Sequence, residues 1–210
     1  MVALRTRSLQ GRSDALQALY DCQAAPTWGG LAVDKCAQDM MVYQEIITAT
    51  RPDIIIECGS WTGGSSLFFA EICHLSGTGE VLSIDIQPPD FPSPLHPRLT
   101  LLKGHSGHPE TIKRVGEWAK GRQGFVILDS DHTKDHVLAE LEAYWPWVAR
   151  GNYLIVEDTN VNGHPVLPDF GPGPWEAVQE WLPKHPGFRQ DTDVEPYLTF
   201  APGGYLKRIA

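Results

Sequence analysis

The apolar run at 53–58 and the glycine-rich turn after it constrain the fold more than any other part of the chain. Three consecutive isoleucines at 54–56 show no alternation with polar residues, which is typical of a parallel strand covered by helices on both faces. The glycines between 59 and 64 permit a sharp turn and a close approach of the backbone to a ligand. A helical pattern follows at 65–75, with Ser65 or Ser66 as its expected cap. The segment predicts a buried strand, a ligand-binding turn and a helix whose N-terminus faces the ligand.

The spacing of these glycines differs from that of the dinucleotide-binding pattern. Trp61 stands where the dinucleotide-binding pattern G-x-G-x-x-G needs its second glycine. The segment instead resembles the first motif of the class I S-adenosylmethionine-dependent methyltransferases, in which an acidic residue, here Glu57, precedes the G-x-x-x-G from Gly59 to Gly63. A turn of this kind can also serve packing alone. The next apolar run, however, ends in Asp85, and a carboxylate there can accept both hydroxyls of a ribose.

Length and composition favour a single enzyme domain. The chain has 210 residues, a net charge of −9 and no runs of Lys or Arg, so we expect no nucleic-acid partner. Its apolar stretches are of strand length and residues 1–11 lack the apolar core of a signal peptide, so we expect no membrane partner and a cytoplasmic location. The four cysteines show no C-x-x-C spacing and are expected to be reduced; they are Cys22, Cys36, Cys58 and Cys73.

Strands and helices alternate along the chain, which predicts an α/β fold with a parallel sheet and helices on both faces. We expect strands at 53–58, 80–86, 99–103, 124–129 and 152–157, helices at 13–23, 35–50, 65–75, 109–120, 134–148 and 175–182, and a closing pair of strands at 188–191 and 205–209. Asp34 is the expected cap of the second helix. In the helix at 134–148, helical periodicity predicts that Asp135, Glu140 and Glu142 face away from the core.

Acidic residues gather after the fourth and fifth strands. Asp129, Asp131 and His132 follow the fourth strand, and Glu157 and Asp158 follow the fifth. Carboxylates that share one crevice repel each other, so either their pKa values shift or a cation neutralises them; oxygen ligands favour Mg²⁺ or a similar divalent ion. One of the aspartates after the fourth strand can be explained as a helix cap, but capping does not account for four acids. The sequence therefore favours a metal site.

Three motifs together resemble the cephalosporin hydroxylase family. They are Leu128-Asp-Ser-Asp-His-Thr133, Val137-Leu-Ala-Glu-Leu141 and Leu154-Ile-Val-Glu-Asp-Thr-Asn-Val-Asn-Gly-His-Pro-Val166, within a resemblance that runs from about Trp28 to Ile209. The family has the Rossmann-like class I methyltransferase fold, and its relatives include metal-dependent sugar O-methyltransferases of natural-product biosynthesis. The resemblance implies a seven-stranded, mostly parallel sheet with an antiparallel last strand. We expect a methyltransferase domain at 35–210, preceded by an N-terminal helix and lid segment at 1–34.

The resemblance also implies roles for individual residues. Gly59, Ser60 and Ser65 would contact the methionine part of S-adenosylmethionine, Asp85 its ribose, and Ser106 its adenine. The full set expected at the cofactor is Glu57, Gly59, Ser60, Gly63, Ser65, Asp85, Ser106 and Asp129. The metal ligands would be Glu157, Asp158 and one or both of Asp129 and Asp131. His132 matches the general base of the sugar O-methyltransferases. Alternatively, its imidazole N–H only orients a carboxylate that binds the metal. The family's lid implies that Lys35 and Tyr43 close over the site.

We therefore predict transfer of a methyl group from S-adenosylmethionine, with Mg²⁺ or another divalent cation, to a hydroxyl of a small natural product or sugar, as in antibiotic biosynthesis. We also expect a homo-oligomer. One alternative is a non-haem oxygenase, which would need redox iron, usually held by two histidines and a carboxylate; only His132 lies beside the acids. The other is a binding or partner protein without catalysis. Against it stands the acid cluster, since buried carboxylates that nothing neutralises are costly to keep.

Overall fold

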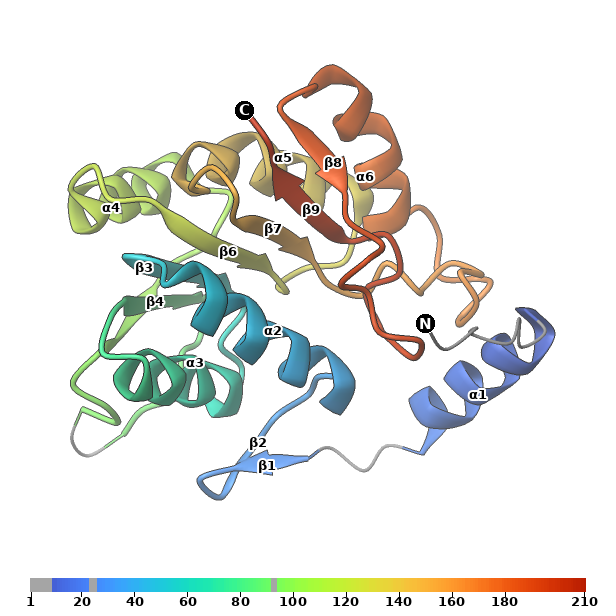
Figure 1. Ribbon diagram of the computed structural model, residues 1–210, viewed down its shortest axis with the longest axis horizontal. Helices are drawn as coiled ribbons and strands as arrows, with labels where there is room; N and C mark the ends of the chain where they lie inside the picture. The colour runs from blue at the N-terminus through green and yellow to red at the C-terminus, as the bar shows by residue number, and fades with distance from the viewer. Residues whose placement is uncertain (1–8, 23–25, 92–93) are drawn as a thin grey trace.

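A seven-stranded sheet forms the centre of the computed structural model, which describes residues 9–22, 26–91 and 94–210 (Figure 1). The strand order is β5-β4-β3-β6-β7-β9-β8. Five strands pair in parallel: β3 (Ile54–Cys58), β4 (Glu80–Asp85), β5 (Leu99–Lys103), β6 (Gly124–Leu128) and β7 (Tyr153–Val156). The last strand, β9 (Tyr205–Arg208), runs antiparallel to both β7 and β8 (Phe188–Gln190). The expected sheet, including its antiparallel last strand, is confirmed.

Helices cover both faces of the sheet, as the alternation predicted. The described helices are α1 (Leu9–Asp21), α2 (Ala37–Thr50), α3 (Gly64–Leu75), α4 (Pro109–Ala119), α5 (Lys134–Tyr144) and α6 (Pro174–Trp181), with 3₁₀ turns η1 (Trp145–Trp147) and η2 (Leu182–Lys184). Ile54 and Ile56 belong to the core that α4, α5 and α6 cover, whereas Ile55 belongs to the core under α2 and α3. This explains the run of isoleucines, because neighbouring side chains of a strand point to opposite faces and both faces are buried.

The order of the strands reverses between β3 and β6. From β3 the chain builds outward through β4 and β5 on one side, and then continues with β6 and β7 on the other. Ligands of doubly wound folds bind at such a switch point, beyond the carboxyl ends of the strands. Gly59, which follows β3, has φ of 97°, and a Cβ there would collide with the backbone carbonyl of Asp129, which follows β6. Glycine is required at this position because the two strand ends approach so closely.

A short hairpin of β1 (Thr27–Trp28) and β2 (Leu31–Ala32) precedes α2. The helix α2 begins at Ala37 and its N-cap is Cys36, so the expected cap at Asp34 was wrong and Lys35 lies outside the helix. Likewise α3 is capped by Gly63 without a side-chain bond, because the hydroxyls of Ser65 and Ser66 are bonded to Glu57.

Two further boundaries differ from the sequence prediction. The helix α5 ends at Tyr144, and the chain continues as the 3₁₀ turn η1, in which Pro146 has no N–H to extend the helix. The helix α1 begins at Leu9, before the expected start, and the predicted end at 23 lies outside the described residues. Nowhere in the described ranges is there a helix both long and apolar enough to cross a membrane.

Candidate active site

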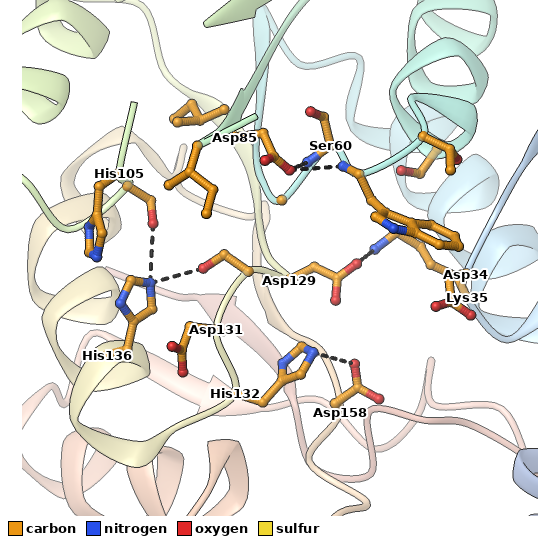
Figure 2. Close-up of a pocket in the computed structure, with 18 of the residues that line it drawn as sticks. Asp34, Lys35, Ser60, Asp85, His105, Asp129, Asp131, His132, His136 and Asp158 are labelled. Atoms are coloured by element: carbon orange, nitrogen blue, oxygen red, sulfur yellow. Dashed lines mark hydrogen bonds and ion pairs between the residues drawn. The ribbon is translucent and has the colours of Figure 1, made fainter. Parts of the chain in front are cut away.

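A cavity of about 850 Å³ lies at the switch point, beyond the carboxyl ends of the parallel strands (Figure 2). This volume is within the range of small-molecule binding sites, which is roughly 300–1,000 Å³. Nine of the residues expected at the site line it: Gly59, Ser60, Ser65, Asp85, Ser106, Asp129, Asp131, His132 and Asp158. Glu57, Gly63 and Glu157 do not line it. The cavity therefore joins the region expected to bind the cofactor to most of the acid cluster.

The carboxylate of Asp85 is held by the backbone at one side of the cavity. Its Oδ2 accepts hydrogen bonds from the backbone N–H groups of Ser60 (3.0 Å) and Trp61 (2.9 Å), and its Oδ1 accepts one from Gln87 (2.8 Å). The hydroxyl of Ser60 is buried and has no hydrogen-bond partner within the described part of the chain. Trp61 has φ of 40°, and such strained backbone is most often found at functional sites. A fixed carboxylate and an unpaired hydroxyl side by side are suited to a polar ligand.

Glu57 lies beneath the cavity and is completely buried. Its Oε1 accepts a hydrogen bond from Ser65 Oγ, and its Oε2 accepts bonds from Ser66 Oγ and Ser83 Oγ, each at 2.6 Å. The three hydroxyls give both carboxylate oxygens a partner and tie the first turn of α3 to β3 and β4. Glu57 thereby fixes the position of Ser65, which does line the cavity.

At the opposite end of the cavity, Lys35 lies among the acids. Its ammonium forms ion pairs with Asp129 and with Glu157 (3.2 Å to Oε1), and only 2% of its side chain is exposed. Glu157 also accepts a hydrogen bond from the hydroxyl of Tyr43 at 2.6 Å. Burial would lower the pKa of Lys35, but the facing carboxylates outweigh burial and raise it above its usual value. Lys35 therefore forms a buried ion-pair network with two carboxylates of the acid cluster.

The geometry divides the acids into two groups. One ligand atom each of Asp129, His132 and Asp158 lies within 4.8 Å of the others, an arrangement able to hold a metal ion. His132 Nε2 is 3.4 Å from Asp158 Oδ2 (Figure 2). Glu157 is held apart by Lys35 and Tyr43, while Asp131 Oδ1 accepts a hydrogen bond from the backbone N–H of Thr133 (2.8 Å). Asp131 thus stabilises the turn before α5, but the N-cap of this helix is Thr133, so the helix-cap interpretation of these aspartates was wrong.

Asp158 has a perturbed carboxyl pKa and a left-handed backbone conformation. Burial, followed by the charge of Glu157, raises its pKa, although His132 acts in the opposite direction. Its φ of 52° lies in the left-handed region, which is uncommon for residues other than glycine, asparagine and aspartate. A raised carboxyl pKa in a cavity is typical of functional sites.

A second network supports the end of the cavity near Ser106. His136 Nε2 is 2.9 Å from Ser130 Oγ and 3.2 Å from Ser106 Oγ, and Glu140 Oε1 accepts a hydrogen bond from Ser130 at 2.6 Å. The hydrogen bond with Glu140 raises the pKa of His136. Glu140 is completely buried, so the prediction that it faces away from the core was wrong. The i,i+4 spacing of His136 and Glu140 on α5 was the one sequence signal for this network.

Comparison with known proteins identifies a family and several relatives of this chain. The family model described as rhamnosyl O-methyltransferase/CmcI matches residues 21–209. Rhamnosyl O-methyltransferases of Mycobacterium leprae (strain TN) and Mycobacterium bovis (strain BCG) are 42% and 39% identical to the chain; each match covers 87% of this chain, and 82% and 78% of the respective relative.

Solved structures of low sequence identity share the fold. A structure of CmcI with Mg and SAM has a TM-score of 0.69 and 20% identity, covering 88% of this chain and 77% of that one. The methyltransferase MycE of the mycinamycin biosynthetic pathway, in complex with Mg and SAH, has a TM-score of 0.53 and 18% identity, covering 82% and 44%. Together with the family match over nearly the whole chain, these likenesses show that the protein belongs to the rhamnosyl O-methyltransferase/CmcI family and has the class I methyltransferase fold.

Proposed function

We propose that this protein is an O-methyltransferase that uses S-adenosylmethionine and a divalent cation, Mg²⁺ foremost, to methylate a hydroxyl of a sugar. The two mycobacterial relatives carry the name rhamnosyl O-methyltransferase, and the chain covers most of their length. One structural observation carries the proposal: a single cavity is lined by Asp85 and Ser60 at one end and by Asp129, His132 and Asp158 at the other. A methyl donor bound at the first group can therefore reach an acceptor held at the second.

The residues present fit the cofactor. Asp85 is already oriented by three backbone N–H groups, two on Oδ2 and one on Oδ1, so the remaining lone pair of Oδ1 can accept a hydroxyl of a ribose at little entropic cost. The unpaired hydroxyl of Ser60 offers a hydrogen bond to the methionine part. Ser106, with His136 behind it, lines the cavity in the loop after β5, where we place the adenine. Glu57 accepts a hydrogen bond from Ser65, and the N–H of Gly63 donates to the carbonyl of Ser60, so both support residues of this surface.

The residues also fit a divalent cation. Mg²⁺ is commonly held by one or two carboxylates together with water and substrate oxygens, and we assign Asp129 and Asp158 as those carboxylates. When bound, the cation would supply Lewis-acid polarisation of the acceptor hydroxyl, which makes its proton easier to remove. Asp131 and Glu157 have other partners, which argues against them as ligands.

We assign His132 as the general base. Its imidazole lies in the cavity beside Asp158, with 31% of its side chain exposed, and a neutral imidazole there can take the proton of an acceptor hydroxyl while the methyl group is transferred. Asp158 then stabilises the imidazolium that forms, because the two side chains are within 3.4 Å. The imidazolium can then release its proton to solvent through the exposed part of the ring.

An assay with labelled S-adenosylmethionine tests the function directly. The purified protein is supplied with Mg²⁺ and a simple rhamnoside, and we expect labelled sugar and S-adenosylhomocysteine in equal amounts. A rhamnoside whose hydroxyls are already methylated is the matched control and should give no transfer. Absence of S-adenosylhomocysteine binding, together with no transfer to any free glycoside, would overturn the proposal. A role in natural-product biosynthesis, a homo-oligomeric state and a cytoplasmic location remain predictions from the sequence.

A further inference from the structure

Two aromatic side chains line the cavity and have no role in the chemistry described so far. Tyr20 belongs to α1 and Phe200 to the segment before β9, and both are half-buried. Their rings meet edge to face with centroids 5.5 Å apart, which is a favourable arrangement of two aromatic rings. We call this pair the aromatic corner. It gives the wall of the cavity an apolar surface made by two parts of the chain that are far apart in the sequence.

The aromatic corner lies at the acidic end of the cavity. The carbonyl of Phe200 accepts a hydrogen bond from the backbone N–H of Asn160 (3.2 Å), which is two residues after Asp158. Burial, followed by the charge of Asp158, raises the pKa of Tyr20, so the Tyr20 hydroxyl also lies near that carboxylate. Both rings are therefore neighbours of the residues to which we assign the cation and the acceptor hydroxyl.

The fold holds both parts of the aromatic corner in place. The backbone N–H of Phe200 donates to Asp39 Oδ2 (2.9 Å), and the hydroxyl of Thr199 donates to Asp39 Oδ1 (2.6 Å); Asp39 is completely buried. The ion pair between Arg12 and Glu195 (3.0 Å) joins α1 to the same segment. A ligand that packs against the corner therefore meets a surface that is largely formed before binding.

We propose that the aromatic corner of Tyr20 and Phe200 binds the acceptor sugar and selects a 6-deoxyhexose over the corresponding hexose. The inference rests on the sugar acceptor of the proposed function. A 6-deoxyhexose ends in a methyl group at C6, whose apolar surface can pack against the two rings. A hydroxyl on C6 would lose hydrogen bonds to water against the same rings.

Two sugars that differ only in the C6 hydroxyl test the inference: methyl α-L-rhamnoside and methyl α-L-mannoside. Because a hydrophobic pocket rejects one added hydroxyl by at most roughly a hundredfold, we expect the wild type to favour the rhamnoside in kcat/KM by about 10–100-fold. Tyr20→Ala and Phe200→Ala should reduce this ratio to within about threefold, whereas Tyr20→Phe, which keeps the ring, should retain it. Both sugars are measured on one preparation, so a smaller active fraction cancels in the ratio.

Phe170→Ala is the matched control. Phe170 is 43% exposed and does not line the cavity, so its removal should leave the ratio at the wild-type value. Equal kcat/KM for the two sugars in the wild type, or an unchanged ratio in both alanine variants of the corner, overturns the inference and leaves the proposed function standing. A wild-type protein that binds no S-adenosylhomocysteine and methylates neither sugar overturns the proposed function, and the inference with it.

The rings would contact the aglycone instead if the sugar bound in the opposite direction. Exchanging the methyl aglycone for phenyl would then change kcat/KM, and Tyr20→Ala would remove that dependence while the C6 preference stayed. This result also contradicts the inference.

A measurement on the wild type covers the case in which the alanine variants do not fold. In saturation-transfer NMR with S-adenosylhomocysteine, Mg²⁺ and methyl α-L-rhamnoside, the aromatic protons of the protein are irradiated. The C6 methyl protons of the sugar should receive the strongest saturation, because they pack against the rings. Stronger saturation at the aglycone methyl than at C6 would place the sugar in the other direction and refute the proposed selection.

Discussion

Asp85 shows how a single side chain can be prepared for a ligand before the ligand binds. Three backbone N–H groups already fix its carboxylate, and the chain that supplies two of them, at Ser60 and Trp61, is the turn after β3. The carboxylate therefore holds the glycine-rich turn, and in the proposed function it would recognise the ribose at the same time. A substitution at this residue is expected to affect both roles.

We expect Asp85→Ala to weaken binding of S-adenosylhomocysteine by about 1.5–3 kcal/mol, the contribution of one hydrogen bond to a charged group. Isothermal titration calorimetry measures this loss, and Asp85→Asn, which keeps an acceptor, should lose less. Asp53→Ala, an exposed aspartate away from the cavity, should bind as the wild type does. Unchanged affinity in Asp85→Ala would remove the ribose assignment.

His132 differs from the acids around it because two roles are compatible with its position. As general base, His132→Ala should lower turnover by about 10²–10⁴-fold while the affinities for cofactor and Mg²⁺ stay nearly constant. As a residue that only orients Asp158, it should lose Mg²⁺ affinity first and regain activity at high Mg²⁺. Single-turnover rates over a range of Mg²⁺ concentrations separate the two roles. Wild-type turnover in His132→Ala would exclude the base assignment.

At the scale of elements, the segment between β7 and α6 is shaped by one carboxylate. Glu176 Oε2 accepts a hydrogen bond from the backbone of Gly173 (2.7 Å), which caps α6, and Oε1 accepts bonds from Asn162 (2.8 Å) and His164 (3.0 Å). Burial would raise the pKa of Glu176, but these bonds lower it to about 2. Because Lys134 at the start of α5 donates to Pro172 in the same segment, Glu176 also steadies the chain that follows His132.

We expect Glu176→Gln to be less stable than the wild type by about 1 kcal/mol near neutral pH, a value reduced for partial solvent exposure. A lowered carboxyl pKa stabilises the fold above the ordinary value of 4.5, and this contribution is lost as the pH falls toward 2. The difference between wild type and variant should therefore shrink over that window in denaturant titrations. Glu45→Gln, at an exposed position of α2, serves as the control. A difference independent of pH would contradict the assigned pKa.

The sequence was informative where burial alone decides the structure. The uninterrupted isoleucines at 54–56 predicted the central strand to within one residue, because two covered faces leave no other pattern. Helix ends were less predictable, since Cys36 and Gly63 cap their helices without a side-chain bond. Glu140 was predicted to face solvent because helical periodicity takes no account of a hydrogen-bond partner such as Ser130, which lies in the loop after β6.

Part of the site could also be predicted from the sequence. Asp85 ends β4 and Asp129 directly follows β6, so the fold class alone places them at one edge of the sheet. Lys35 was expected only as part of a lid. Its ion pair with Asp129 spans 94 positions of the chain, and no local pattern reports a contact of that range. A lysine beside a helix N-terminus, where it is locally unfavourable, was the available hint.

At the scale of the whole molecule, the cavity is closed by parts distant in the sequence. Tyr20 of α1 and Phe200, which precedes β9, both line it, and their rings meet edge to face with centroids 5.5 Å apart. An ion pair between Arg12 and Glu195 (3.0 Å) joins the same two regions. In Figure 1, α1 lies beside the chain leading to β9 and away from the helices of the sheet. Residues near both ends of the chain thus line the cavity together with the strand ends from its middle.

The separation of the two ends of the cavity predicts how the enzyme responds to loss of its metal. Chelation should abolish methyl transfer and added Mg²⁺ should restore it, since the acceptor hydroxyl depends on the cation. Binding of S-adenosylhomocysteine should persist in chelator, because Asp85 and Ser60 lie at the other end of the cavity and have their own partners in the backbone turn. Transfer assays and calorimetry on the same chelated sample measure both. Full transfer in excess chelator would remove the metal from the mechanism, whereas restoration by Fe²⁺ alone with consumption of oxygen would point to the oxygenase alternative. Loss of cofactor binding in chelator would show that the two ends of the cavity are coupled.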